Sequence, residues 1–274
     1  MTMVWSPDYL GSPGKMVLAK DYPADDDTRA YVAAVESADG QSLEPAVIAA
    51  YDNFIVGCKA DGIWDAIKAS CILAGARTLS GALVPLAGTA PTNFNFVAAD
   101  YDRKTGLVGD GSTKYLDSNR ASNADLQDDA HWTVFPTNYN TRAKFLVGNE
   151  YISNNDAFSG FYFDQSPQIS VLRSRNGSAT APLVVTYLPN KLVGTSRNNS
   201  SSFDRRYNSI SDSASAPSYP PSSVNWYLFR RVNASSPLYS DSRIAFYSIG
   251  EALDLALFDA RVTDLINAIG VAIP

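Results

Sequence analysis

The segment Ser242–Gly270 reads SRIAFYSIGEALDLALFDARVTDLINAIG and joins a strand pattern to a helix pattern. Residues 244–249 are almost all apolar on both alternating faces, which predicts a mostly buried β-strand. Gly250 interrupts the pattern. Apolar residues then recur with helical spacing over 257–269, so we expect an amphipathic helix with Gly270 at its C-cap. Such a strand and helix require a sheet to pack on.

The composition limits the classes of function. The chain has 274 residues, enough to bury a sizeable core, and a net charge of −6. It contains no block rich in lysine or arginine, and nucleic-acid binding requires a basic face. The longest uncharged run, residues 78–99, contains two prolines and several glycines, which makes a membrane span unlikely. We therefore expect neither a nucleic acid nor a membrane as partner.

The N-terminal third predicts helices. Asp25–Asp27 are placed to cap and stabilise the N-terminus of a first helix. A second helix is expected to start at Ser42, with Pro45 in its first turn, and to run to Cys58. The apolar residues that follow suggest a short third helix over 63–72. We divide the chain into an N-terminal arm (1–24), a helical lead-in packed on the sandwich (25–90), and a β-sandwich ending in a helix (91–274).

From Thr92 onward, short β-like runs recur between turn residues at intervals typical of an antiparallel sandwich. Gly109–Ser112 has the composition of a hairpin turn, and the hairpin is expected to neighbour the strand at 243–249. The Ser-, Asn- and Pro-rich stretch 197–223 is expected to be a long excursion from the sheet edge. The predicted strands are 95–98, 106–108, 114–116, 132–136, 144–147, 158–163, 168–172, 183–187, 191–194, 224–230 and 243–249.

The sequence offers few residues for catalysis. No two of the four glutamates lie within five residues of each other, so the paired carboxylates of a sandwich-fold glycosidase strand are absent. His131 is the only histidine, and a lone histidine is more often structural than catalytic. Cys58 and Cys71 are interpreted as buried thiols or as one structural bridge. No cofactor is expected. Calcium is the one ion the chain could bind, through the acidic loop residues Asp100, Asp102 and Asp110.

Two surfaces remain as binding candidates. Tyrosines beside Asn and Asp on loops can stack on sugar rings and hydrogen-bond to hydroxyl groups. The N-terminal arm has apolar residues, which suggests that it packs either on its own domain or on a neighbouring subunit. The arm residues proposed for subunit docking are Trp5, Tyr9, Met16 and Val17. The predicted carbohydrate-binding set comprises Tyr139, Asn140, Tyr151, Asn154, Asn155, Asp156 and Tyr162.

Two motifs carry a resemblance to a known class of protein. TGLVGDGSTKYLDSN (residues 105–119) and AFYSIGEAL (residues 245–253) resemble the laminin-G-like, concanavalin A-like jelly-roll modules of tailed-phage virion proteins. The lead-in at 39–86 is similar to the segment that precedes this module in tail-fibre and structural proteins. The resemblance implies a mainly β fold, an antiparallel jelly-roll sandwich with an N-terminal helical segment and a C-terminal helix. Its calcium-dependent lectin sites cannot be aligned here, so none is carried over.

The resemblance also implies a non-enzymatic protein on the virion surface. It would be a capsid decoration or cement protein, or a tail-fibre or baseplate-associated protein, that docks onto other virion proteins as a homo-oligomer, with a homotrimer favoured by analogy. The alternative is a lectin module that binds a host surface glycan. A polysaccharide-degrading enzyme is the least favoured hypothesis. The chain lacks the heptad or collagen-like repeat that would build a long shaft, which favours a compact protein.

Overall fold

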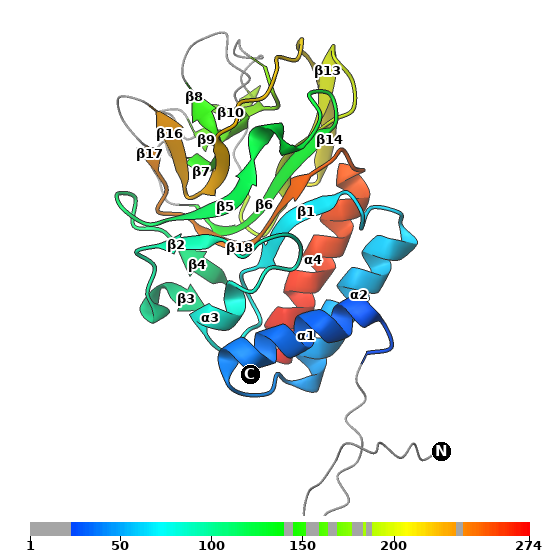
Figure 1. Ribbon diagram of the computed structural model, residues 1–274, viewed down its shortest axis with the longest axis vertical. Coiled ribbons are helices and arrows are strands. Elements are labelled where there is room, and N and C mark those ends of the chain that lie inside the picture. The colour runs from blue at the N-terminus through cyan, green and yellow to red at the C-terminus, as the bar shows by residue number, and fades with distance from the viewer. Residues whose placement is uncertain are drawn as a thin grey trace, which may run out of the picture.

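A computed structural model describes residues 23–139, 145–151, 159–163, 169–176, 183–184, 188–233 and 238–274. The fold is mainly β and antiparallel, with helices near both ends of this part of the chain, as the sequence predicts. Three layers follow one another: a helical layer, an eight-stranded sheet and a seven-stranded sheet. Figure 1 shows the helices gathered on one side of the strands.

The helical layer consists of α1 (Asp26–Asp39), α2 (Pro45–Ala60) and α4 (Leu255–Ala272), with the single-turn α3 (Leu79–Ala82) beside α1. As predicted, Asp25 is the N-cap of α1, where its carboxylate accepts a hydrogen bond from the Thr28 amide at 3.0 Å. The predicted C-cap at Gly270 is wrong, because α4 continues to Ala272 and the buried Ile273 is the cap residue.

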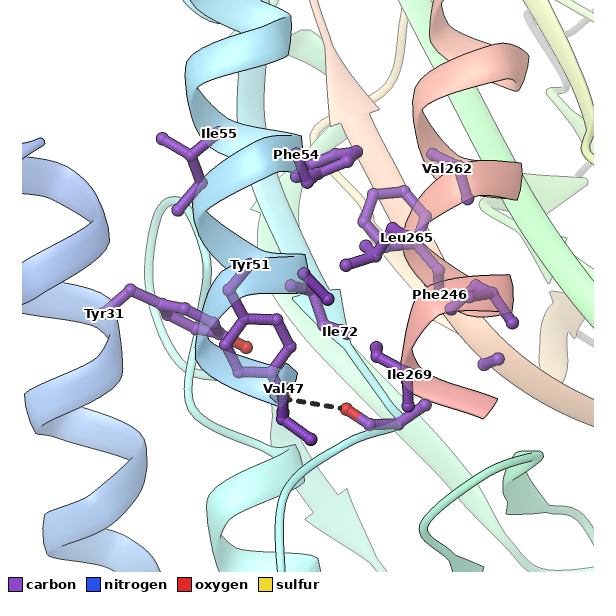
Figure 2. Packing of buried hydrophobic residues seen from close by; sticks show 14 of the residues in the cluster. Tyr31, Val47, Tyr51, Phe54, Ile55, Ile72, Phe246, Val262, Leu265 and Ile269 are labelled. Carbon is purple, nitrogen blue, oxygen red and sulfur yellow. Dashed lines mark hydrogen bonds between the residues drawn. The ribbon is translucent and has the colours of Figure 1, made fainter. Parts of the chain in front are cut away.

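The first core lies between the helices and the eight-stranded sheet. Figure 2 shows Phe54 of α2 and Phe246 of the sheet meeting in this layer, beside Val262 and Leu265 of α4. The Phe246 ring lies 5.7 Å from both the Phe54 and Phe258 rings in edge-to-face geometry. Helices from the two ends of the described chain therefore share one apolar core with the sheet.

The eight-stranded sheet has the order β14-β13-β12-β6-β18-β4-β3, with β1 also paired to β18. Strand β18 is central, since β6 pairs along one of its edges and β1 and β4 share the other. Residues 244–250 of β18 are all buried, as the sequence predicts. The strands are β1 (Ile67–Ile72), β3 (Tyr101–Asp102), β4 (Gly106–Val108), β6 (Ala130–Asn138), β12 (Val193–Arg197), β13 (Ser202–Tyr207), β14 (Ile210–Ser215) and β18 (Arg243–Gly250).

The seven-stranded sheet has the order β11-β10-β9-β7-β15-β5-β2. A three-stranded sheet of order β17-β16-β8 contacts it, with β16 beside β7. A second core, which includes Trp132, Trp226 and Leu228, fills the space between the two large sheets. The remaining strands are β2 (Thr92–Phe94), β5 (Tyr115–Ala121), β7 (Phe145–Gly148), β8 (Glu150–Tyr151), β9 (Gly160–Phe163), β10 (Ile169–Arg173), β11 (Leu183–Val184), β15 (Asn225–Leu228), β16 (Arg230–Asn233) and β17 (Leu238–Tyr239).

The predicted third helix over 63–72 is wrong. Helix α2 ends at Ala60, Gly62 takes a left-handed φ of 70°, and residues 67–72 form β1 instead. The apolar residues there suit a strand buried on both faces, and pairing with β18 satisfies their backbone groups. A short apolar run of this length is ambiguous between helix and strand without knowledge of its neighbours.

The predicted hairpin at Gly109–Ser112 is also wrong, although β4 does neighbour β18. Strand β4 belongs to the eight-stranded sheet and β5 to the seven-stranded sheet, so the turn between them crosses from one sheet to the other. The Asp110 carboxylate holds this crossing by accepting hydrogen bonds from the amides of Ser112, Thr113 and Lys114 at 2.8–3.0 Å.

The Ser-rich stretch 197–223 is not a structureless excursion. It contains the hairpin β13–β14 at one edge of the eight-stranded sheet. Asn208 and Ser209 form the two-residue turn with φ values of 49° and 63°, a backbone conformation typical of tight hairpins. Serine and aspartate dominate its strands, so the alternation of apolar residues that identifies a strand is weak there.

Candidate functional site

His131, the only histidine of the chain, belongs to the interior. It is 1% exposed, with Nδ1 2.5 Å from the Glu251 carbonyl oxygen and Nε2 2.8 Å from the Ser248 hydroxyl. Burial lowers the pKa of His131 to about 4, so the ring is neutral at physiological pH. A histidine in this position joins β6 to the end of β18 and does not face a cleft.

Both cysteines are free and buried. Burial raises the pKa of each thiol to about 12, which leaves almost no thiolate at neutral pH. The interpretation of Cys58 and Cys71 as buried thiols is therefore confirmed, and the alternative of a disulfide bridge between them is wrong.

The acidic loop residues proposed for calcium are engaged within the chain. Asp100 is paired with Lys114 at 2.6 Å, and Asp102 accepts hydrogen bonds from the amides of Lys104 and Thr105. Burial alone would raise the pKa of Asp110, yet hydrogen bonds, with Thr113 the strongest donor, hold it well below its usual value. In the described part of the chain, no group of three or more His, Cys, Asp or Glu residues is arranged to hold a metal ion.

Most residues of the two predicted binding surfaces lie outside the described residues. Tyr139 directly follows β6 and packs, partly buried, against the core between the sheets. Tyr151 and Tyr162 lie in β8 and β9, but their side chains are outside the description. The residues outside it altogether are Asn140, Asn154, Asn155, Asp156 and the arm residues Trp5, Tyr9, Met16 and Val17. The two surfaces stay predictions.

A group of aromatic side chains gathers on the outer side of the seven-stranded sheet. Strand alternation on β5 and β15 turns Leu116 and Leu228 into the core, which places Tyr115 and Tyr227 on the opposite face. Phe94 of the edge strand β2 is the cross-strand neighbour of Tyr115. We call the set formed by Phe94, Tyr115, Tyr227, Tyr239 and Arg230 the aromatic face.

The rings of this face are closely packed. Phe94 and Tyr115 stack in parallel with centroids 4.3 Å apart, and Phe94 remains 36% exposed. Tyr227 and Tyr239 stand 6.0 Å and 6.1 Å from Tyr115 at steep interplanar angles. Tyr115, Tyr227 and Tyr239 are each partly buried. The cluster is therefore packed against the sheet, and Phe94 is its most exposed ring.

Arg230 lies at the centre of the aromatic face. Its guanidinium carbon is 4.3 Å from the centroid of Tyr115, 5.4 Å from that of Tyr239 and 5.5 Å from that of Tyr227. All three distances lie within the range of cation–π attraction. A left-handed φ of 64° at Phe229 separates β15 from β16, and this bend brings Arg230 beside the tyrosines.

Polar groups border the rings. Asp117 follows the same outward alternation as Tyr115 on β5, and its carboxylate accepts hydrogen bonds from the Asn225 side-chain amide at 2.9 Å and the Asn119 backbone amide at 2.8 Å. The hydroxyl groups of Tyr115 and Tyr239 make no hydrogen bond within the described residues. The face thus combines apolar rings, free hydroxyl donors and one cation, which are the groups that recognise sugars.

Sequence reasoning missed this site, although one signal was present. Tyr115 and Asp117 on β5, and Asn225 and Tyr227 on β15, alternate with buried residues and so mark an outward face that carries tyrosines. Which residues of different strands meet is decided by the register, such as Phe94 opposite Tyr115. No local pattern contains that information.

A concave surface lies where the β13–β14 hairpin meets the N-terminus of α4. This open groove has a volume of about 610 Å³. Its charged groups already have partners within the chain. Arg205 forms two hydrogen bonds with Asp212 at 2.6–2.7 Å, Asp254 accepts from the amides of Ala256 and Leu257, and Asp204 accepts from the Ser213 hydroxyl. The aromatic face is therefore the stronger candidate site.

The chain shares its fold, but little sequence, with known proteins. No family model and no curated protein matches it. The sialidase of Trypanosoma rangeli in complex with 2,3-difluorosialic acid matches with a TM-score of 0.50 at 10% identity, covering 84% of this chain and 37% of that chain. The botulinum neurotoxin serotype D binding domain gives 0.46 at 11% identity, covering 73% and 51%.

The enzymatically active domain of bacteriophage CBA120 tailspike protein 2 gives a TM-score of 0.40 at 11% identity, covering 66% of this chain and 30% of that chain. The chain thus spans well under two thirds of the length of each of these three proteins. At 10% identity, the likeness to the sialidase concerns the fold alone. None of the described helices is long and apolar enough to cross a membrane.

Proposed function

We propose that this chain is a non-enzymatic carbohydrate-binding protein of a tailed-phage virion surface, and that the aromatic face is its sugar contact. The observation that carries the proposal is the cluster of Phe94, Tyr115, Tyr227 and Tyr239 on an open sheet face. The apolar faces of sugar rings stack on such rings, and the hydroxyls of Tyr115 and Tyr239 are free to bond with a ligand. The virion assignment rests on the sequence resemblance.

The interior position of the groups most suited to catalysis supports a binding role. His131 is neutral and buried, and the thiols of Cys58 and Cys71 have raised pKa values in the core. Acid–base or nucleophilic chemistry requires such groups within reach of a substrate. On the aromatic face, Asp117 is already hydrogen-bonded to Asn225.

Docking to other virion proteins is the second part of the proposal. The described chain begins at Pro23 beside α1, where Asp25 pairs with Lys59 of α2 at 2.6 Å. The N-terminal arm therefore joins the protein at the helical layer, which lies across the eight-stranded sheet from the seven-stranded sheet. This arrangement would let the arm attach to the particle or to sister subunits, in a homotrimer by analogy, while the aromatic face points away.

A panel of immobilised neutral and acidic bacterial polysaccharides tests the sugar contact. We expect the wild-type protein to bind at least one polymer and Phe94→Ala to weaken that binding by up to about tenfold, since one stacked aromatic contact contributes ~0.5–1.5 kcal/mol. Leu188→Ala is the control: it removes an apolar side chain that is 50% exposed and does not belong to the aromatic face, so this variant should bind as the wild type does. Equal binding by Phe94→Ala, no binding to any polymer, or release of oligosaccharide products would contradict the proposal.

A further inference from the structure

Arg230 differs from most arginines of the described chain in what surrounds its charge. Most of the others pair with a carboxylate, as Arg103 does with Glu44 and Arg206 with Asp259. Arg197 is instead surrounded by backbone carbonyls, at 3.0–3.2 Å. Arg230 has aromatic rings beside it, and neither a carboxylate nor a carbonyl contacts its guanidinium within the described residues.

The buried Nε atom of Arg230 also has no hydrogen-bond partner in the described structure. An unpaired buried donor is unfavourable. The Arg230 side chain as a whole is only partly buried, so its terminal N–H groups are the ones that a ligand could reach. Three tyrosine rings restrain the guanidinium plane, so little side-chain freedom is lost when a ligand binds. The arginine is thus prearranged for an anionic group that arrives from outside.

None of the carboxylates near the aromatic face forms an ion pair with Arg230. Asp100 is paired with Lys114, whereas Asp117 accepts hydrogen bonds from the uncharged amides of Asn225 and Asn119 and keeps its charge. The chain as a whole carries a net charge of −6, but charges beyond ~8 Å are largely screened at physiological ionic strength. An anion in direct contact with the guanidinium would be attracted by Arg230 most strongly, because Coulomb energy falls with distance.

We propose that the aromatic face selects carboxylate-bearing sugars such as uronic acids, with Arg230 binding the carboxylate while the rings hold the sugar. This inference rests on the proposed function and specifies its ligand class. A planar carboxylate matches the two parallel N–H groups of a guanidinium, whereas a neutral sugar offers only hydroxyl groups.

The test compares each acidic oligosaccharide with its own neutral form. Oligosaccharides of polygalacturonate, alginate and hyaluronate are titrated by calorimetry before and after their carboxyl groups are reduced to alcohols. We expect at least one acidic form to bind about tenfold more tightly than its reduced form, the size of effect typical of a charge-assisted hydrogen-bond pair. Ring size and linkage are unchanged, so the difference isolates the carboxylate.

Three variants assign the preference to Arg230. Arg230→Met keeps a long apolar side chain beside the tyrosines but removes the charge, and it should bind both forms equally. Arg230→Lys keeps the charge without the planar fork and should retain only part of the preference. Arg29→Gln removes the same charge from the exposed surface of α1 and should leave the preference intact.

The outcomes separate the two proposals. Equal binding of acidic and reduced forms by the wild type, or a preference that survives in Arg230→Met, overturns the role of Arg230 but leaves the sugar contact standing. If the wild type binds no oligosaccharide in either form and no polymer of the polysaccharide panel, the proposed function itself fails.

Discussion

Replacing Phe246 with alanine should destabilise the protein strongly, because this side chain joins the helical layer to the central strand. Phe246 is fully buried and contacts the rings of Phe54 and Phe258. Phe54 lies in α2 and Phe258 in α4, so the two contacts come from helices near opposite ends of the described chain. Removing a buried phenylalanine costs ~3–5 kcal/mol, and each lost edge-to-face pair accounts for ~0.5–1.5 kcal/mol of such a cost. We therefore expect a loss of about 4 kcal/mol in the free energy of unfolding.

The assay is urea unfolding followed by tryptophan fluorescence, at equal protein concentrations. With a urea dependence of ~3 kcal/mol per M, a loss of ~4 kcal/mol lowers the unfolding midpoint by more than ~1 M. Phe94→Ala serves as the matched control, since it removes the same side chain from an exposed edge strand and should cost less than ~1 kcal/mol. A loss below ~1 kcal/mol for Phe246→Ala would refute the packing of the helices on the eight-stranded sheet.

Three further predictions concern other parts of the chain. The folded-state pKa of His131 is lowered to about 4, below the ordinary 6.5, so the unfolded state takes up the proton first and stability falls as pH decreases. Between pH 7 and pH 5 the wild type should lose about 2 kcal/mol more than His131→Gln in urea unfolding, and equal losses would contradict a buried neutral ring. Asp110→Ala should cost about 2 kcal/mol, because three amides lose their acceptor, and a thermal midpoint equal to that of the wild type would show that the crossing between sheets does not depend on Asp110. Deleting residues 1–22 should leave the unfolding midpoint unchanged, since the Asp25 cap remains, but should abolish assembly with sister subunits in sedimentation velocity; an oligomer of unaltered size would refute the docking arm.

The fold was largely predictable from local patterns. The buried strand at 243–250 and the helix after Asp254 follow from apolar spacing. The N-cap of α1 follows from Asp25, and the first turn of α2 follows from Pro45. The errors occurred where tertiary contacts decide between alternatives. The run at 67–72 is a strand because it pairs with the edge of β18. A run of five apolar or small residues and one lysine fits a helix or a strand equally well and does not reveal that pairing.

The candidate site was less predictable than the fold. Phe94, Tyr115, Tyr227 and Tyr239 lie far apart along the sequence, and pairings such as Arg230 opposite Tyr239 bring them together. Sequence reasoning chose instead the loop residues between Tyr139 and Asp156, where tyrosine and asparagine are adjacent along the chain. Proximity in sequence is a poor guide to proximity on a sheet face, because the neighbours of a strand come from other strands.

Chemical-shift mapping with the acidic oligosaccharide that binds most tightly tests the central claim most directly. In protein labelled on its aromatic rings, we expect the largest shift changes at Phe94, Tyr115, Tyr227 and Tyr239. In Arg230→Met, the acidic oligosaccharide should cause no larger changes at these rings than its reduced form does. Changes confined to Tyr139 and Tyr151, or to neither group, would contradict the assignment of the aromatic face as the sugar contact.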